Sequence, residues 1–273
     1  MKLRIVFSFA LVLWLASGAI AQVNAPKLGF ARYADGSVFK VYGLESNLLI
    51  NTQLLSSAAA LSFSDAGGLV ATGGEIQLLA LDGKQLGAYS SNESAPVVNI
   101  DGALTTAVAW LPSHRELVRW TGQSFVATQV AGAQLPGTVT SVQLTSASSA
   151  RLLAADANNN VFAISIALPN GLVTSVDQVP GVQGPTFEQY GFMVSHDANG
   201  LHVSAPNGSV RTLPLSAPDL TIERMASDWL HLSSSTGEDW VLHLNATALH
   251  LSQLPQPTVV RRLAPRPIEE KAQ

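Results

Sequence analysis

Leu81-Asp82-Gly83-Lys84 lies between two short apolar segments, and this arrangement of a glycine turn between apolar segments recurs along the chain. Asp-Gly and Asn-Gly pairs favour β-hairpins, because the tight primed turns that join antiparallel strands need positive φ angles. Apolar runs such as Val38–Tyr42, Leu69–Thr72 and Leu201–Val203 alternate with Gly, Asn, Asp and Ser, which predicts short strands and almost no helix. The other turns of the series centre on Gly43, Gly122, Gly171, Gly208 and Ala246, the last with Asn245 at the flexible position.

The spacing of these turns indicates a repeat. Successive intervals are 40, 39, 49, 37 and 38 residues, and we place the excess of the long interval in the Ser/Thr/Ala-rich stretch 131–150. A period of about 39 residues with roughly four strands is typical of a propeller blade. The alternative is coincidence in an all-β chain with 21 glycines, but apolar strands flank each turn in step. The sequence therefore predicts an all-β, six-bladed β-propeller, with seven blades as the alternative.

Three turn segments carry a family resemblance. Ser64-Asp65-Ala66-Gly67-Gly68-Leu69-Val70-Ala71-Thr72 resembles the "SPDGxxLA" turn and strand of WD-repeat-like and Tol-system-like propellers, without its proline. Asp156–Phe162 and Asp197–Val203 are similar to other turns of that group. The resemblance covers most of residues 29–254 at the level of pattern, and the Gly-His and Trp-Asp dipeptides of WD repeats are absent. It implies an architecture and no particular activity.

The two ends of the chain complete the predicted organisation. Only three strands precede residue 58, and Thr258–Leu263 is a β-like run, so we expect this C-terminal strand to close the first blade. Pro265 and Pro267 follow and end the strand, because proline cannot donate to a ladder. The domains are then a signal peptide (1–21), a short linker (22–28), a single propeller (29–263) and a flexible tail (264–273).

The N-terminal segment has the layout of a secretory signal peptide. Lys2 and Arg4 precede the largely apolar run Ile5–Ala16, and Ala19 and Ala21 are the small residues at the cleavage positions. The alternative is a membrane anchor, which needs about 20 apolar residues. We expect cleavage after Ala21 and a monomeric periplasmic or extracellular protein without a membrane span.

Composition excludes several classes of protein. Charged residues make up 12% of the chain, about half of the usual ~25%, which disfavours helical bundles and coiled coils. The chain has no cysteine, so disulfides, zinc ribbons and thiolate clusters are excluded. Cleavage after Ala21 leaves 13 basic and 19 acidic residues, with four of the basic ones after Pro255. Such an acidic body is a poor nucleic-acid binder, because phosphate binding depends on Lys and Arg.

No motif for catalysis, cofactor binding or metal binding is present, so we predict no such residues. His231, His243 and His250 cluster in the sequence, but polar strand positions explain them more simply than metal ligation does. Asp156–Asn160 fits a turn better than a calcium loop. The chemically most varied loop is a candidate for partner contact through Trp110, His114, Arg115 and Glu116.

Two functions remain open at this stage. The first is an exported, non-catalytic propeller that binds a protein or an envelope component. The alternative is a secreted propeller enzyme, either hydrolase- or lactonase-like or a cofactor-dependent dehydrogenase, with its site in the central channel.

Overall fold

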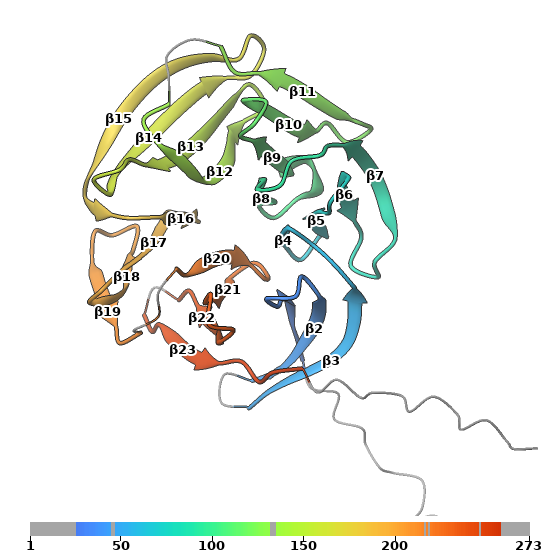
Figure 1. Cartoon of the computed structure of the whole chain (residues 1–273), viewed down its shortest axis with the longest axis vertical. Coiled ribbons are helices and arrows are strands. Elements are labelled where there is room, and N and C mark those ends of the chain that lie inside the picture. Colours follow the sequence, from blue (N-terminus) through green and yellow to red (C-terminus); the bar gives the residue numbers. More distant parts are fainter. Residues whose placement is uncertain are drawn as a thin grey trace, which may run out of the picture.

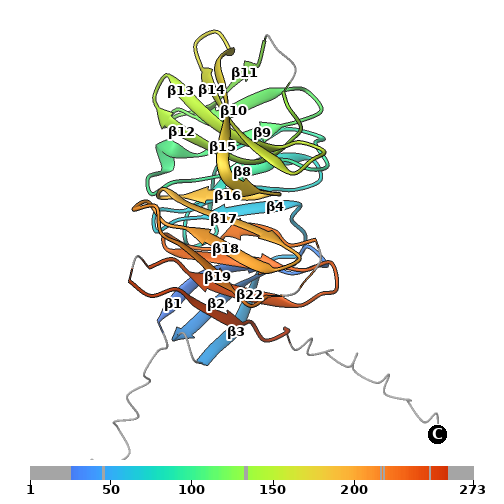
Figure 2. The same ribbon diagram turned by 90° about the vertical axis from the view of Figure 1, so that its left-hand side faces the viewer.

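A computed structural model of the chain describes residues 26–44, 47–131, 135–215, 217, 219–245 and 247–257. These residues form 23 β-strands and one short 3₁₀ helix, so the all-β prediction is confirmed. The sheets are arranged like blades around a common axis (Figure 1), and the body is seen edge-on in Figure 2. Within these ranges, no helix has the length and apolar character of a membrane span.

Each group of strands follows the chain as an antiparallel meander. The first sheet contains β1 (Lys27–Arg32), β2 (Val38–Leu44) and β3 (Asn47–Leu55). The second group contains β4 (Ala60–Phe63), β5 (Gly68–Ala71), β6 (Glu75–Leu79) and β7 (Gln85–Ser90). The third contains β8 (Val97–Asn99), η1 (Leu104–Thr106), β9 (Val108–Leu111), β10 (Glu116–Trp120) and β11 (Phe125–Gln129).

Three further groups follow in the same way. The fourth contains β12 (Thr138–Ser146), β13 (Ser149–Ala155), β14 (Asn160–Ala167) and β15 (Leu172–Gln183). The fifth contains β16 (Thr186–Gln189), β17 (Phe192–Asp197), β18 (Gly200–Ser204) and β19 (Val210–Leu213). The sixth contains β20 (Thr221–Arg224), β21 (Trp229–Ser233), β22 (Asp239–His243) and β23 (His250–Gln253).

Four of the six turns that predicted the repeat occupy equivalent places, whereas Gly43 lies within β2 and Ala246 lies outside the described residues. Gly83, Gly122, Gly171 and Gly208 all have positive φ and all lie between the third and fourth strands of their groups. An L side chain rarely adopts this conformation, which explains why glycine recurs at these points. The repeat is therefore confirmed. The long interval contains β12, β13 and β14, whose lengths of nine, seven and eight residues exceed those of their counterparts.

The predicted blade number is wrong. Hydrogen bonding divides the strands into five sheets, because Arg224 of β20 pairs in parallel with Ser62 of β4 and joins two groups into one eight-stranded sheet. Four sheets contain four strands or more and form a four-bladed arrangement, beside which lies the three-stranded sheet β1–β3. The spacing of the turns indicates how many hairpins the chain forms. It does not indicate which strands near the axis are hydrogen-bonded to one another. The predicted closing strand, Thr258–Leu263, lies outside the described residues.

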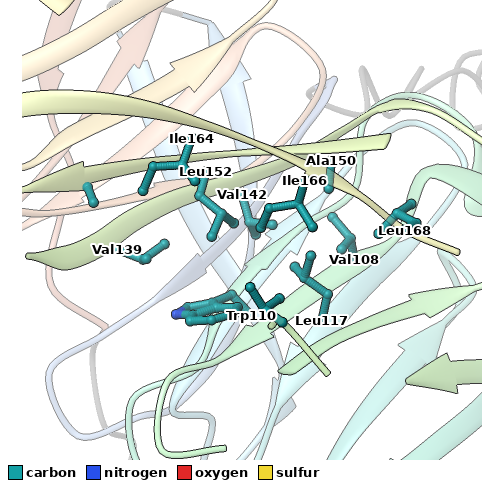
Figure 3. Packing of buried hydrophobic residues seen from close by; sticks show 12 residues of the cluster. Val108, Trp110, Leu117, Val139, Val142, Ala150, Leu152, Ile164, Ile166 and Leu168 are labelled. Carbon is teal, nitrogen blue, oxygen red and sulfur yellow. The ribbon is translucent and has the colours of Figure 1, made fainter. Parts of the chain in front are cut away.

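Buried apolar side chains fill the spaces between neighbouring groups of strands. One cluster joins β9 and β10 to β12, β13 and β14, with Trp110 packed beside Val139, Val142 and Ile166 (Figure 3). A second joins β16–β19 to β20–β23, and a third joins β4–β7 to β8–β11. Burial of this kind stabilises a fold by about 25 cal/mol per Å² of apolar surface. It holds the groups in the ring order in which they are drawn in Figure 1.

The sheet β1–β3 lies between the two halves of the eight-stranded sheet. On one side, Tyr33 and Val41 pack with Trp229 and Leu254. On the other side, the ring of Phe30 stacks on Phe63 with centroids 4.0 Å apart. The first sheet thus contacts both the next group along the chain and the last one, as its position beside β23 in Figure 1 illustrates. β1 begins at Lys27, within the segment predicted as a linker.

Candidate functional site

The first strands of five groups all begin at the same end of the axis, as the strand register shows. At this end, each first strand starts opposite one of the last three residues of the second strand, and the turn to the third strand follows. The pairs are Ala60 with Ala71, Val97 with Trp110, Thr138 with Ala155, Thr186 with Ser195, and Thr221 with Ser233.

A continuous hollow, which we call the mouth, occupies this end. Its central part has a volume of about 340 Å³. A part of about 180 Å³ shares Thr140 and Phe187 with it, and a part of about 690 Å³ shares Thr138 and reaches Trp110. The central part is lined by Arg32, Ala59, Ala60, Leu61, Ser94, Ala95, Pro96, Val97, Val98, Thr138, Val139, Thr140, Phe187, Thr221, Ile222 and Glu223. The mouth is therefore a broad surface of threonine and small apolar side chains.

The charged pair in the mouth is neutralised internally. Arg32 Nε donates to both carboxylate oxygens of Glu223, at 2.9 and 3.0 Å. Glu223 Oε1 also accepts a hydrogen bond of 3.1 Å from the backbone N–H of Leu61. Glu223 is 6% exposed, so these donors and not bulk water surround its carboxylate. The pair joins β1, β4 and β20 at the axis.

A second buried carboxylate lies on β16, just beyond the residues that line the mouth. Glu188 Oε1 accepts a hydrogen bond of 3.2 Å from Arg151 Nη1, and the Glu188 N–H donates to Ser141 Oγ at 3.3 Å. Glu188 Oε2 and the neighbouring Gln189 Oε1 are buried and have no hydrogen-bond partner among the described residues. β16 therefore carries two acceptor oxygens that can take additional donors.

Arg224 crosses the axis at the opposite end. Its Nη1 donates to the carbonyl of Ile100 at 2.7 Å and to Asp101 Oδ1 at 2.9 Å. Its Nη2 donates to Tyr190 Oη and, at 3.3 Å, to the carbonyl of Ser227. The side chain is 1% exposed. Arg224 is a structural brace, because its donors bind groups from three different parts of the ring.

The predicted partner-contact loop lies between two hollows. Trp110 is 2% exposed and belongs to the core, although its edge lines the mouth together with Arg115. His114 and Glu116 line a separate hollow of about 420 Å³ on the other side of the loop. Tyr89 Oη donates to Glu116 Oε2 at 2.9 Å. The structure therefore divides the four predicted residues between two surfaces.

Glu93 anchors this loop through hydrogen bonds to Ser113. Glu93 Oε2 accepts a hydrogen bond of 2.8 Å from the Ser113 N–H, and Oε1 accepts one of 3.1 Å from Ser113 Oγ. Burial acts to raise the pKa of Glu93, but the hydrogen bonds from Ser113, Ala95 and Ser94 outweigh it and hold the pKa below its usual value. Glu93 thus keeps its charge and holds the loop beside the mouth.

Two of the clustered histidines, His231 and His243, have separate partners. His231 Nε2 lies 3.0 Å from Asp239 Oδ1, and His243 Nε2 lies 3.0 Å from Asp228 Oδ2 with its ring stacked on Trp229. Among the described residues, no three His, Asp or Glu side chains converge in a manner that would hold a metal ion. Asp156 Oδ1 accepts the N–H groups of Asn158 and Asn160, so Asp156–Asn160 forms the β13–β14 turn.

Sequence reasoning missed the charged residues at the axis, Arg32, Glu188, Glu223 and Arg224. A signal was present, because Thr186-Phe187-Glu188-Gln189 and Thr221-Ile222-Glu223-Arg224 share the order Thr, apolar, Glu, polar. Both segments are first strands of their groups, and both begin at the mouth. An inward carboxylate in two equivalent strands indicates a functional or structural role at the axis.

Antiparallel meanders arranged around an axis, with a hollow at one end, define a β-propeller. No protein-family model matches the chain, and no curated protein matches it either. Solved structures do. A nidogen/laminin complex matches with a TM-score of 0.55 and 12% identity, over 84% of this chain and 93% of that one.

Two further structures are similar at lower scores. BamB from Moraxella catarrhalis has a TM-score of 0.36 and 14% identity, over 81% of this chain and 75% of that one. A streptogramin B lyase has a TM-score of 0.44 and 11% identity, over 87% and 86%. At 12% identity the likeness to the nidogen/laminin complex shows the propeller fold alone. The narrower resemblance to WD-repeat-like or Tol-system-like propellers is not confirmed.

Proposed function

We propose that the chain is an exported, non-catalytic β-propeller that binds a protein or an envelope component through the mouth. One observation carries the proposal: the hollow is continuous across five first strands, which are β4, β8, β12, β16 and β20. A broad surface of threonine hydroxyls and small apolar groups suits a protein contact, in which a polar rim surrounds an apolar centre.

The electrostatics of the mouth support binding over catalysis. A general acid or base needs a carboxylate or imidazole that exchanges a proton with substrate. Glu223 is instead bound by Arg32 and by the N–H of Leu61, which occupy its carboxylate oxygens. The Arg32–Glu223 pair links strands β1, β4 and β20.

Export is the second part of the proposal. Lys2 and Arg4, the apolar run Ile5–Ala16 and the small residues Ala19 and Ala21 support a cleaved signal peptide. The nidogen structure with the same fold is a complex with a second protein, laminin, which is a precedent for the role proposed here.

Capture from an envelope extract of the native host tests the binding surface. Thr138 and Thr221 are exposed residues of the mouth, so Thr138→Tyr with Thr221→Tyr fills the hollow without adding charge. Thr52→Tyr with Thr174→Tyr is the matched control on the outer strands β3 and β15.

We expect a partner that is retained by the unmodified protein and by the control, and that is lost from the mouth variant. Equal retention by all three proteins would refute the assignment of the mouth. Mass spectrometry of the exported protein tests the remaining part, with Gln22 as the expected first residue.

A further inference from the structure

We propose that the mouth receives an acidic segment of its partner, in which Asp or Glu carboxylates accept hydrogen bonds from Arg32 and Arg115. This inference rests on the proposed function and names the chemistry of the partner. Three observations carry it, which are the charge of the side chains lining the mouth, the unused donors of Arg32 and the backbone conformation of Arg115.

The side chains that line the mouth have the opposite charge balance from the chain as a whole. Three charged residues line its three parts, with Arg32 and Glu223 in the central part and Arg115 in the part of about 690 Å³. Two cations and one anion give this lining a formal charge of +1. Cleavage after Ala21 leaves 13 basic and 19 acidic residues in the whole chain. The mouth is therefore a local positive site on an acidic protein, which favours an anionic group there.

Arg32 has donors that its ion pair leaves unused. Its Nε makes both contacts with Glu223, and Nη1 and Nη2 have no partner among the described residues. The side chain is 16% exposed and lines the central part of the mouth. Two N–H donors at the end of a guanidinium match the two oxygens of a carboxylate. Glu223 is therefore a positioning residue, because it holds the guanidinium while the outer nitrogens remain available to a ligand.

Arg115 has a backbone conformation that arginine rarely adopts. Its φ is 50°, and its N–H donates to the carbonyl of Pro112 at 3.2 Å. The corresponding turns of two other groups contain the same bond between residues three apart, and there the positive φ belongs to Asn159 and Gly237. Asparagine and glycine adopt positive φ at little cost, whereas most L side chains are strained in it. The arginine at this turn therefore carries a backbone cost, which points to a role of its side chain.

The two arginines line parts of the mouth that meet. The central part and the part that contains Arg115 share Ala95, Thr138 and Val139, so one segment that crosses these residues reaches both parts. Thr138 is exposed and adds a hydroxyl that can donate to the segment. The turn with Arg115 is held in place, because the N–H of Val130 donates to the Arg115 carbonyl at 2.8 Å. Preorganised donors of this kind reduce the entropic cost of binding.

The test measures binding of a defined probe to the full exported chain by fluorescence anisotropy. The probe is a short rhodamine-labelled peptide in which Asp and Glu alternate with Gly, Ser and Val. Its C-terminus is amidated, so that side chains supply all of its carboxylates. A counterpart peptide carries Lys at every acidic position.

Four variants separate charge, donors and fold. Arg115→Asn removes the charge and relieves the backbone, because asparagine is the residue at the equivalent Asn159. Arg32→Gln with Glu223→Gln removes the outer donors of Arg32 and leaves the formal charge of the lining unchanged. Arg115→Lys keeps the charge. Arg211→Asn is the matched control, since it removes an exposed arginine from the outer strand β19.

We expect the acidic peptide alone to bind. Its affinity should fall about tenfold in Arg115→Asn and in the paired variant of Arg32 and Glu223, and stay unchanged in Arg211→Asn. Arg115→Lys should bind within about threefold of the unmodified chain, because it keeps the point charge. Thermal unfolding should show that Arg115→Asn is at least as stable as the unmodified chain, since its backbone is relieved. A clearly lower Tm would make Arg115 a structural residue and overturn its assignment.

No binding of the acidic peptide, equal binding of both peptides, or equal affinity in every variant would each overturn the proposal. Unchanged binding to the mouth variant, Thr138→Tyr with Thr221→Tyr, would place the peptide outside the mouth and have the same consequence. If the partner captured through the mouth is retained by Arg115→Asn and by the paired variant, the mouth remains a binding site and only its preference for acidic segments fails.

Discussion

Tyr33 Oη donates a hydrogen bond of 3.0 Å to the backbone carbonyl of Pro255, which ties the first sheet to the segment that follows the last strand. Burial raises the pKa of Tyr33, and the nearby charge of Asp239 raises it further, so the hydroxyl remains a neutral donor. Leu254 anchors the same segment by donating its N–H to the carbonyl of Asp239 at 2.8 Å. The two ends of the described chain are therefore joined by directed bonds as well as by apolar packing.

Replacing Tyr33 with Phe removes this part-buried bond and leaves the Pro255 carbonyl without this donor. We expect a loss of about 1 kcal/mol in the free energy of unfolding, and a fall in Tm of about 2–4 °C for a domain of this size. Tyr42→Phe is the control, because the Tyr42 hydroxyl makes no hydrogen bond within the described residues. Thermal unfolding of both variants would show an equal change if the bond had no role.

Arg224→Met tests the brace at the far end of the axis. The substitution leaves the carbonyl of Ile100 without its donor and removes the partner of Asp101. We expect a loss of about 3–5 kcal/mol, since breaking a buried charged network exposes its uncompensated members. Urea unfolding is the measurement. The exposed Arg211→Met should change stability by less than about 0.5 kcal/mol, and a similarly small effect at Arg224 would show that the brace is dispensable.

Glu93 gives the loop beside the mouth a pH dependence. Its pKa is lower in the folded chain than in the unfolded one, so its contribution is present above the unfolded value of about 4.3 and is lost as the pH falls through the folded value. We expect Glu93→Gln to cost about 1–3 kcal/mol at pH 7 and progressively less below pH 4. Tm measured for both proteins from pH 7 to pH 3 gives the difference. Parallel curves would contradict the role assigned to the carboxylate.

Gly29 lies where β1 meets the last group of strands. A Cβ at this position would be 2.2 Å from the carbonyl oxygen of Met225, which accepts the N–H of Phe30 at 3.1 Å. Gly29→Ala should therefore separate the first and last groups and cost about 1–3 kcal/mol. Gly74→Ala is the control, because no atom lies within 4 Å of its added Cβ. Urea titrations that give the same midpoint for both variants would contradict the close approach.

The sequence predicted the class of fold because its turns require positive φ. Gly83, Gly122, Gly171 and Gly208 could be aligned since glycine is the residue that adopts this conformation without strain. The joining of β4 to β20 could not be predicted, because the pairing of Ser62 with Arg224 depends on tertiary arrangement and leaves no local pattern. Because the β4–β20 pairing joins two groups of strands into one sheet, the predicted blade number was wrong.

The candidate site was predictable only in part. The loop that carries His114 and Arg115 was singled out by its varied chemistry, and of these two residues Arg115 lines the mouth while His114 lines the separate hollow. The threonines that form the mouth are ordinary strand residues, and their shared surface exists only once the first strands converge. Arg32 and Glu223 are separated by 191 positions, so no local motif could join them.

The contact between Leu61 and Glu223, 162 positions apart, has a consequence for the order of folding. β4 reaches its neighbour in the eight-stranded sheet only after the chain has been synthesised as far as β20. Until then one edge of β4 remains unpaired, and loop-closure entropy makes such a distant pairing slow. An unpaired edge is a template for association with other chains. Survival of this protein during biogenesis therefore depends on how long nascent β4 is kept from pairing with a strand of another molecule.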